Sequence, residues 1–257
     1  MKDEFRFKQF SVKQDRCAMK VGTDGVLLGC WAEGGENILD IGTGTGLIAM
    51  MMAQRFPNAH VDALEIDSSA AYQALENIAQ SPFKKRVSVV EESLQNYAAS
   101  VCGECNFSDG MYDSIVSNPP YFINSLKNPN AERAKARHTD TLSYADLFTG
   151  VAKLIKAGGV FSAVIPVECE DLFCSEAFLH GFFLTRKYMV RTVGRVAQGV
   201  SECAERRGGL VGGARRRNRG GAQAREGRDR GRRAGRRRNR GGRAKARIVQ
   251  KHVQKRG

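Results

Sequence analysis

The residues best suited to chemistry are an amide, two prolines and aromatic side chains that follow an apolar, β-type run. That run is Tyr112–Ser117, and Asn118-Pro119-Pro120-Tyr121-Phe122 comes directly after it. Neither proline can donate to a sheet ladder, so the strand must end there in a rigid turn. The turn holds an amide oxygen, a fixed carbonyl and a flat ring together. These groups can grip a planar group that carries an NH2.

A second chemical stretch is the glycine-rich run Asp40-Ile-Gly-Thr-Gly-Thr-Gly46, which lies between an apolar strand and a helix. Glycines let the backbone turn sharply and approach a ligand closely. Glu65 follows ~20 residues later at the end of the next strand, where a carboxylate can accept both ribose hydroxyls. A dinucleotide loop is a rival interpretation, although the spacing is GxGxG after an acid rather than GxGxxG. The Gly-Lys-Ser/Thr ending of a phosphate loop does not occur in this run.

The elements that must position these residues alternate between strand and helix. After a short strand or hairpin near Phe5–Val12 and a short helix near Val26–Trp31, the pattern is regular. We expect strands at 37–41, 60–66, 86–90, 112–117, 160–165 and 182–193, and helices at 47–55, 68–80, 144–155 and 168–179. This order predicts an α/β fold with a mostly parallel sheet covered on both faces. The carboxyl ends of its strands would bring Asp40–Gly46, Glu65 and Asn118 to one edge, where such sheets bind ligands.

These features resemble the class I S-adenosylmethionine-dependent methyltransferases, which have a Rossmann-like fold. The resemblance implies that the cofactor is S-adenosylmethionine, bound by Asp40, Gly42, Gly44, Gly46 and Glu65. The family often has a carboxylate after the third strand, near the adenine of the cofactor. Glu92 is the candidate here, whereas Ser93 aligns where Asp is common.

Asn-Pro-Pro-Tyr is characteristic of methyltransferases that act on an NH2 group, either adenine N6 or a glutamine amide. The lone pair of such a nitrogen is delocalised, so the nitrogen is a poor nucleophile. Bonds from its two hydrogens to the Asn118 side chain and the Pro119 carbonyl would strengthen as positive charge develops on it. Tyr121 would stack on the base, worth about 1–3 kcal/mol. Such a transfer needs no metal and no covalent nucleophile.

Three separated segments are similar to the bacterial tRNA1(Val) (adenine-37-N6)-methyltransferases: Phe7–Gly29, Asn118–Phe122 and Ala136–Leu142. The resemblance implies methylation of adenine 37 beside the anticodon, with tRNA as the partner. Lys20, Thr23 and Asp24 would then line the cofactor or substrate pocket, although helix capping alone would explain Thr23 and Asp24. Substrate contacts are expected from Phe122 and from Arg137 and His138, which lie in a basic loop over 123–141. Basic side chains there would hold phosphates.

Charge divides the chain unevenly. Residues 1–205 carry 20 basic and 25 acidic side chains, whereas residues 206–257 carry 21 and 2. We expect an N-terminal extension at 1–36, a methyltransferase domain at 37–193 and an Arg/Gly-rich tail at 194–257 that cannot fold alone. The tail is either a disordered RNA-binding segment or the product of a translated frameshift. In both cases the final strand of the sheet would be missing or disrupted.

Composition also limits the compartment and the competing functions. Cys102-Gly-Glu-Cys105 has no second pair or histidine cluster to complete a zinc site, so we expect no metal. No apolar run reaches the ~18–20 residues that cross a bilayer. These features predict a cytoplasmic protein with no membrane partner, and they leave its oligomeric state open. The alternatives to a tRNA methyltransferase are a protein-glutamine methyltransferase acting on release factors and a non-catalytic RNA-binding protein.

Overall fold

A computed structural model of the protein describes residues 4–104, 110–119, 142–190 and 248–255. Its first elements are a two-stranded antiparallel hairpin, β1 (Glu4–Arg6) with β2 (Ser11–Lys13), and the helix α1 (Thr23–Trp31). Phe5 pairs with Val12 in the hairpin, and Phe10 is buried beyond it. The near alternation of apolar residues therefore predicted this hairpin correctly.

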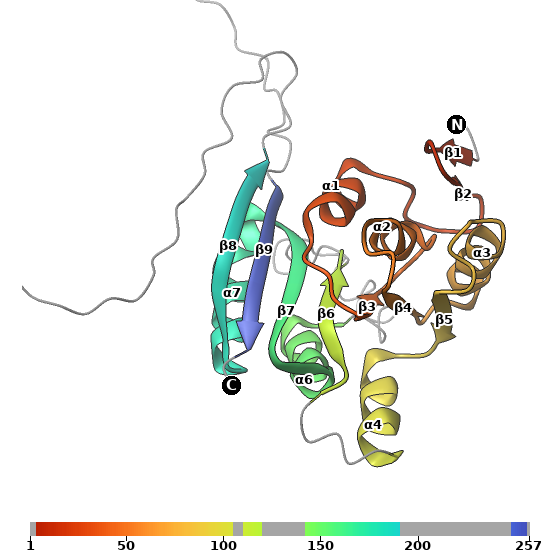
Figure 1. The fold of residues 1–257 in the computed structure, drawn as a ribbon. Coiled ribbons are helices and arrows are strands. Elements are labelled where there is room, and N and C mark those ends of the chain that lie inside the picture. Colours follow the sequence, from red (N-terminus) through yellow and green to blue (C-terminus); the bar gives the residue numbers. More distant parts are fainter. Residues whose placement is uncertain (1–3, 105–109, 120–141, 191–247, 256–257) are drawn as a thin grey trace, which may run out of the picture. The chain divides into compact units, whose positions relative to one another are not determined.

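The central sheet has seven strands in the order β5-β4-β3-β6-β7-β9-β8 (Figure 1). From β5 to β7 the neighbouring strands are parallel, and β9 is antiparallel to both β7 and β8. The bounds are β3 (Asn37–Ile41), β4 (His60–Glu65), β5 (Val87–Glu91), β6 (Tyr112–Ser117), β7 (Ile155–Pro166), β8 (Phe182–Val190) and β9 (Ile248–Lys255). The five parallel strands confirm the predicted α/β fold.

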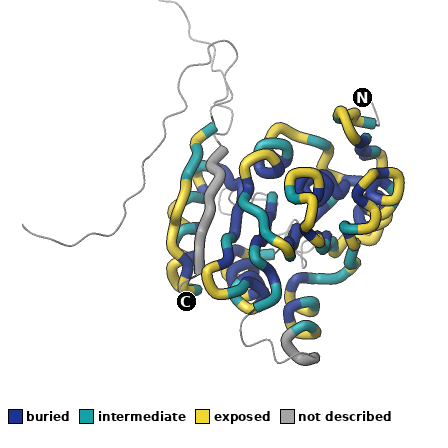
Figure 2. The backbone as a smooth tube through the Cα atoms, viewed as in Figure 1, coloured by how far each residue is buried: buried dark blue, intermediate teal, exposed yellow. Residues whose placement is uncertain are grey.

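Helices cover both faces of this sheet, and each face has its own apolar core. One core includes Leu28 of α1 and Met50 of α2, and the other includes Phe148 of α6 and Phe173 of α7. The bounds are α2 (Leu47–Arg55), α3 (Ser68–Ala79), α4 (Leu94–Glu104), α6 (Tyr144–Leu154), a short 3-10 helix η1 (Val167–Cys169) and α7 (Glu170–Leu179). Figure 2 shows burial concentrated where these helices meet the sheet. Within the described ranges, no helix is long and apolar enough to cross a bilayer.

Several boundaries differ from those expected. The helix expected at 144–155 ends at Leu154, and the strand expected from 160 already begins at Ile155, so Ala157-Gly158-Gly159 lies inside β7. Gly158 has a φ of 76° there, and the register of β7 against β6 shifts between Tyr112 and Ser114. A polar segment that we did not expect to be helical forms α4, whose Leu94 and Ala98 are buried.

The strand β9 corrects the expectation that the final strand is missing or disrupted. Its backbone pairs with β7 from Pro166 to Val160 and with β8 from Val190 to Phe182. Strand pairing uses backbone N–H and C=O groups, which any residue other than proline supplies in full. Ile248, Val249 and Val253 also give this segment apolar side chains after the Arg/Gly-rich stretch. A short strand in an otherwise basic tail is therefore compatible with the sheet.

Candidate active site

The glycine-rich turn joins β3 to α2 and is folded back on β4. The N–H groups of Gly42 and Thr43 both donate to the carbonyl of Leu64, at 2.9 and 3.0 Å. Gly42, Gly44 and Gly46 all have positive φ, at 71°, 56° and 79°. Residues that carry a side chain rarely adopt this left-handed backbone conformation, so the turn requires glycine.

The three glycines face different surroundings. A Cβ atom added to Gly42 or Gly44 would meet nothing within 4 Å, so both face open space. A Cβ atom on Gly46 would instead contact Ala74 and Ile78 at 3.4–3.5 Å. The turn therefore leaves room for a ligand above its first two glycines and packs against α3 at its third.

Asp40 supports this turn from beneath. Its carboxylate is completely buried, and Oδ2 accepts from the Thr43 hydroxyl at 2.6 Å and from the Ala49 N–H at 3.0 Å. The other oxygen, Oδ1, has no hydrogen-bond partner. Burial raises the pKa of Asp40 to about 7, against the hydrogen bonds from Thr43 and Ala49, which lower it. Asp40 does not line the pocket described below, so we expect it to influence a ligand indirectly, by holding the turn in shape.

Glu65 ends β4 on the open side of the turn. Its Oε2 accepts from the Gly44 N–H at 2.8 Å, and its Oε1 accepts from the N–H groups of Ile66 and Asp67 at 3.0 and 3.1 Å. A carboxylate has about four acceptor positions, so these backbone donors fix its orientation and leave it able to accept from a ligand. Glu65 is partly exposed and lines the pocket.

The helix α3 begins beside Glu65. Its N-cap is Asp67, whose Oδ1 accepts from the Ala70 N–H at 2.8 Å. Ser68 and Ser69 are thus inside the helix, because the carboxylate of the preceding residue reaches the free N–H. Asp67 also lines the pocket.

The chain after β5 reaches the same region. The N–H of Glu92 donates to the carbonyl of Glu65 at 3.0 Å, which continues the pairing of β4 with β5. Glu92 and Ser93 both line the pocket. The structure therefore places the two candidates for the adenine end of a cofactor together and does not choose between them.

Asn118 and Pro119 complete the site from β6. The Ser117 hydroxyl donates to the carbonyl of Ile41 at 2.9 Å, which joins the end of β6 to the start of the glycine-rich turn. Asn118 is half-buried and Pro119 is buried, and both line the pocket. Tyr121, Phe122, Arg137 and His138 lie outside the described residues, so their expected roles stay predictions.

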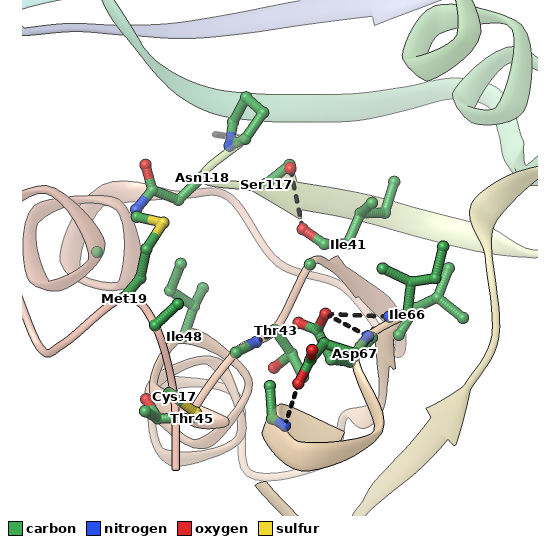
Figure 3. A pocket seen from close by; sticks show the side chains of 18 of the residues that line it. Cys17, Met19, Ile41, Thr43, Thr45, Ile48, Ile66, Asp67, Ser117 and Asn118 are labelled. Atoms are coloured by element: carbon green, nitrogen blue, oxygen red, sulfur yellow. Dashed lines mark hydrogen bonds between the residues drawn. The ribbon is translucent and has the colours of Figure 1, made fainter. Parts of the chain in front are cut away.

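All these elements surround one pocket with a cavity volume of about 1060 Å³. Its last wall is the segment before α1, which sequence reasoning largely missed. Figure 3 shows Cys17 and Met19 of this segment across the pocket from Ile66 and Asp67. Lys20 and Asp24 also line it, as the resemblance implied, whereas Thr23 does not appear in the lining. The helix α1 begins at Thr23 with Gly22 as its N-cap, so neither Thr23 nor Asp24 occupies the N-cap position itself.

The pocket suits a nucleoside cofactor with a polar tail. The open space over Gly42 and Gly44 admits a close approach to the backbone, and Glu65 stands beside it as an acceptor for ribose hydroxyls. In the part of the chain that the structure describes, no three His, Cys, Asp or Glu side chains are grouped to hold a metal ion. The parallel sheet with this turn and Glu65 at its carboxyl edge defines a class I S-adenosylmethionine-dependent methyltransferase.

Comparison with known proteins agrees with this class and narrows it. The Methyltransferase small domain family matches residues 20–165. The tRNA1(Val) (adenine(37)-N6)-methyltransferase of Bacteroides thetaiotaomicron is 50% identical over 191 residues, which cover 73% of this chain and 77% of that protein. The protein of the same name from Trichodesmium erythraeum is 47% identical over 198 residues, covering 76% and 80%. This chain belongs to the tRNA1(Val) (adenine(37)-N6)-methyltransferase family.

Solved structures support the fold alone. A methyltransferase structure from Thermoplasma acidophilum aligns with a TM-score of 0.51 at 12% identity, covering 89% of this chain and 71% of that one. An S-adenosylmethionine-dependent O-methyltransferase from Thermotoga maritima aligns with a TM-score of 0.50, also at 12% identity, covering 91% and 64%. Both similarities agree with the class I architecture.

Proposed function

We propose that this protein transfers the methyl group of S-adenosylmethionine to N6 of adenine 37 in the anticodon loop of tRNA1(Val). One observation carries the proposal: Gly42, Gly44 and Glu65 line the same pocket as Asn118 and Pro119. The residues proposed to bind the methyl donor and those proposed to bind the amine thus line one cavity. The membership of the family, whose relatives carry this activity in their names, supplies the substrate.

On the cofactor side, the chain's own residues bind and orient. S-adenosylmethionine supplies a methyl group on a positively charged sulfur, which is already activated for transfer. Gly42 and Gly44 provide the space for its close approach, and Glu65 accepts from its ribose. Glu92 stands near the adenine end of this proposed site. Asp40 holds the turn in shape through Thr43 and Ala49.

On the amine side, Asn118 and Pro119 accept the two hydrogens of adenine N6. The bonds draw the nitrogen lone pair out of the ring and strengthen as the nitrogen becomes positive, which is the condition for catalytic stabilisation. The hydrogen bond from Ser117 to Ile41 fixes the start of this grip relative to the glycine-rich turn. Alignment of donor and acceptor at about 3 Å then provides most of the catalysis.

The RNA must present adenine 37 unstacked, as anticodon-loop bases can be. We propose that Tyr121 and Phe122 contact the base, and that Arg137 and His138 contact the RNA backbone beside it. A tRNA partner also suits the cytoplasm, which we propose as the location. Within the described residues, Cys17, Cys30, Cys169 and Cys174 form no disulfide.

We propose that residues 1–36 extend a catalytic domain at 37–193 and form part of its active site. Lys13 of the extension forms an ion pair with Glu76 of α3, and Arg16 to Gly22 line the pocket. For the remaining segment, 194–257, the proposal of an Arg/Gly-rich tail is limited by β9, which belongs to the sheet.

The proposal is tested with radiolabelled methyl donor, wild-type protein and the Asn118→Ala variant, each offered tRNA, release factor or neither. Wild type should label tRNA alone. Asn118→Ala should label tRNA about 10²–10³ times more slowly, because the hydrogen bond from adenine N6 to the Asn118 side chain, which strengthens in the transition state, is lost. The dissociation constant of this variant for the cofactor should stay within about threefold of the wild-type value, since Asn118 is not one of the residues proposed to bind the cofactor. Label in release factor but not in tRNA would reject the proposal.

A further inference from the structure

The segment Lys13–Val21, which we name the strap, joins the hairpin to α1 and contacts α3 on the way. It forms no helix or regular strand beyond Lys13, yet its backbone is held by buried side chains. Asn77 and Gln73 of α3 and Gln14 of the strap itself provide these contacts, with exposed fractions of 2%, 0% and 7%. Burial of an amide side chain costs free energy unless its polar atoms are hydrogen-bonded. The hydrogen bonds of these three side chains therefore indicate their structural role.

Asn77 makes three of these contacts with one amide. Its Oδ1 accepts from the Lys13 N–H at 2.8 Å, and its Nδ2 donates to the Lys13 carbonyl at 2.9 Å. The same Nδ2 donates to the carbonyl of Thr45, in the glycine-rich turn, at 2.9 Å. The side chain therefore acts as a pairing partner for the strap and ties it to the turn.

Gln73 lies one helical turn earlier on the same face of α3. Its Oε1 accepts from the N–H of Arg16 at 3.1 Å. Farther along the strap, Gln14 Oε1 accepts from the N–H of Val21 at 2.8 Å. The strap is thus fixed near its start, its middle and its end.

The strap and the turn form adjoining parts of the pocket wall, joined by Asn77. The strap residues in the lining are Arg16, Cys17, Ala18, Met19, Lys20 and Val21. On the other side of Asn77 is Thr45, which lines the pocket as well. The position of the strap relative to the turn therefore depends on a side chain that does not itself line the pocket.

We propose that Asn77, assisted by Gln73, is a positioning residue that holds the strap against the glycine-rich turn and thereby sets the affinity for the methyl donor. This inference rests on the proposed function, because it assumes that the pocket binds S-adenosylmethionine. Asn77 does not itself line the pocket. Its removal leaves the Lys13 and Thr45 backbone groups unpaired, and the strap gains freedom that cofactor binding must then remove.

The sequence carries a signal for this role. Gln73 and Asn77 are spaced i, i+4 on a helix face whose other members, Ala70, Ala74 and Ile78, are buried and apolar. Two amides on such a face predict buried hydrogen bonds to another segment. The partner segment, 64 residues away for Asn77, can be found only from the structure.

The test compares wild type with Asn77→Ala, Gln73→Ala and a matched control, Tyr112→Phe. The control also removes buried hydrogen bonds, from the Tyr112 hydroxyl to Asp62 at 2.7 Å and with Tyr97 at 2.5 Å, but Tyr112 does not line the pocket. Isothermal titration calorimetry with S-adenosylhomocysteine gives cofactor-site affinity without turnover. Steady-state kinetics then give KM for each substrate, and hydrogen exchange reports on the strap amides.

We expect Asn77→Ala to weaken S-adenosylhomocysteine binding about tenfold and Gln73→Ala about threefold, the scale of one or two lost hydrogen bonds. KM for the methyl donor should rise in parallel, while KM for tRNA and kcat at saturation change less than about twofold. Strap amides should exchange faster in both variants. Tyr112→Phe should lower the melting temperature and leave the binding affinity unchanged.

Unchanged affinity in folded Asn77→Ala, or a loss matched by Tyr112→Phe at equal destabilisation, would overturn the inference. If Asn77→Ala does not fold, Gln73→Ala decides by the same criteria. Failure of the wild type to bind S-adenosylhomocysteine would instead refute the proposed function. The two failures are therefore distinguishable.

Discussion

Two carboxylates in the active site have different roles because their surroundings differ. Glu65 is partly exposed, lines the pocket and is oriented by the N–H groups of Gly44, Ile66 and Asp67. Asp40 is fully buried beneath the same turn and faces Thr43 and Ala49. The motif alone presents both as cofactor residues, whereas their burial differs: Glu65, which we propose binds the cofactor, lines the pocket, and Asp40 supports the turn from beneath.

Asp40 should make stability depend on pH. Its folded-state pKa of about 7 exceeds the ordinary 3.8, so the folded chain keeps a proton that the unfolded chain has already released. The contribution of the protonated Asp40 carboxyl to the free energy of unfolding is fully present below about pH 3.8 and is lost as the pH rises to about 7. Relative to Asp40→Asn, wild type should lose about 2 kcal/mol of unfolding free energy between pH 5 and pH 7. Urea unfolding of both proteins across this range measures the difference, and parallel pH profiles would contradict it.

At the scale of elements, the glycine-rich turn connects a buried strand to a buried helix while keeping one side open. Gly42 and Gly44 face the open side, and Gly46 faces α3. The turn is anchored by Leu64 behind it and by Asn77 through Thr45. Its shape is thus set by two neighbouring elements, β4 and α3, as well as by its glycines.

The turn offers a matched pair of substitutions. Gly44→Ala and Gly46→Ala both force alanine into the left-handed region, at a cost of about 1–2 kcal/mol each. Only Gly44→Ala puts its methyl group where we propose that the cofactor binds. We expect it to weaken S-adenosylhomocysteine binding at least about tenfold, whereas Gly46→Ala should stay within about threefold. Calorimetry on both variants provides the measurement, and equal losses of affinity would show that strain, not occupied space, explains the effect.

At the scale of the whole molecule, the sheet is completed by a segment remote in sequence. The strand β9 lies between β7 and β8, although the chain from 191 to 247 separates it from β8. The strand β9 pairs with β8. Phe182 of β8 is buried in the apolar core that also contains Phe148 and Phe173. Loss of β9 would leave β7 and β8 each with an unpaired edge.

Removal of residues 246–257 should therefore lower the melting temperature by about 5 °C or more, since several strand pairings are lost. Deletion of residues 204–245 provides the control, because it keeps β9 and removes most of the Arg/Gly-rich sequence. That variant should melt within about 2 °C of wild type. Differential scanning calorimetry with light scattering compares them. Equal melting of wild type and the 246–257 deletion would argue that β9 contributes nothing to the sheet.

Much of the alternation of strands and helices was predictable because the parallel strands contain short apolar runs and helices such as α3 and α6 have one apolar face. The edge that gathers Gly42, Glu65 and Asn118 followed from the rule for parallel sheets. Three features were not predictable in this way. The helix α4 lies in a polar segment, β9 depends on backbone pairing with distant strands, and the strap is held by amides of α3. All three depend on contacts between segments far apart in the chain.

The most direct test of the function uses an unmodified tRNA1(Val) transcript and the same transcript with guanine in place of adenine 37. We predict transfer of about one methyl group per adenine-37 transcript and none to the other, because guanine presents no N6 amine to Asn118 and Pro119. Nuclease digestion and mass spectrometry should place N6-methyladenosine at position 37. Equal methylation of both transcripts, or methylation at another nucleotide, would contradict the proposal.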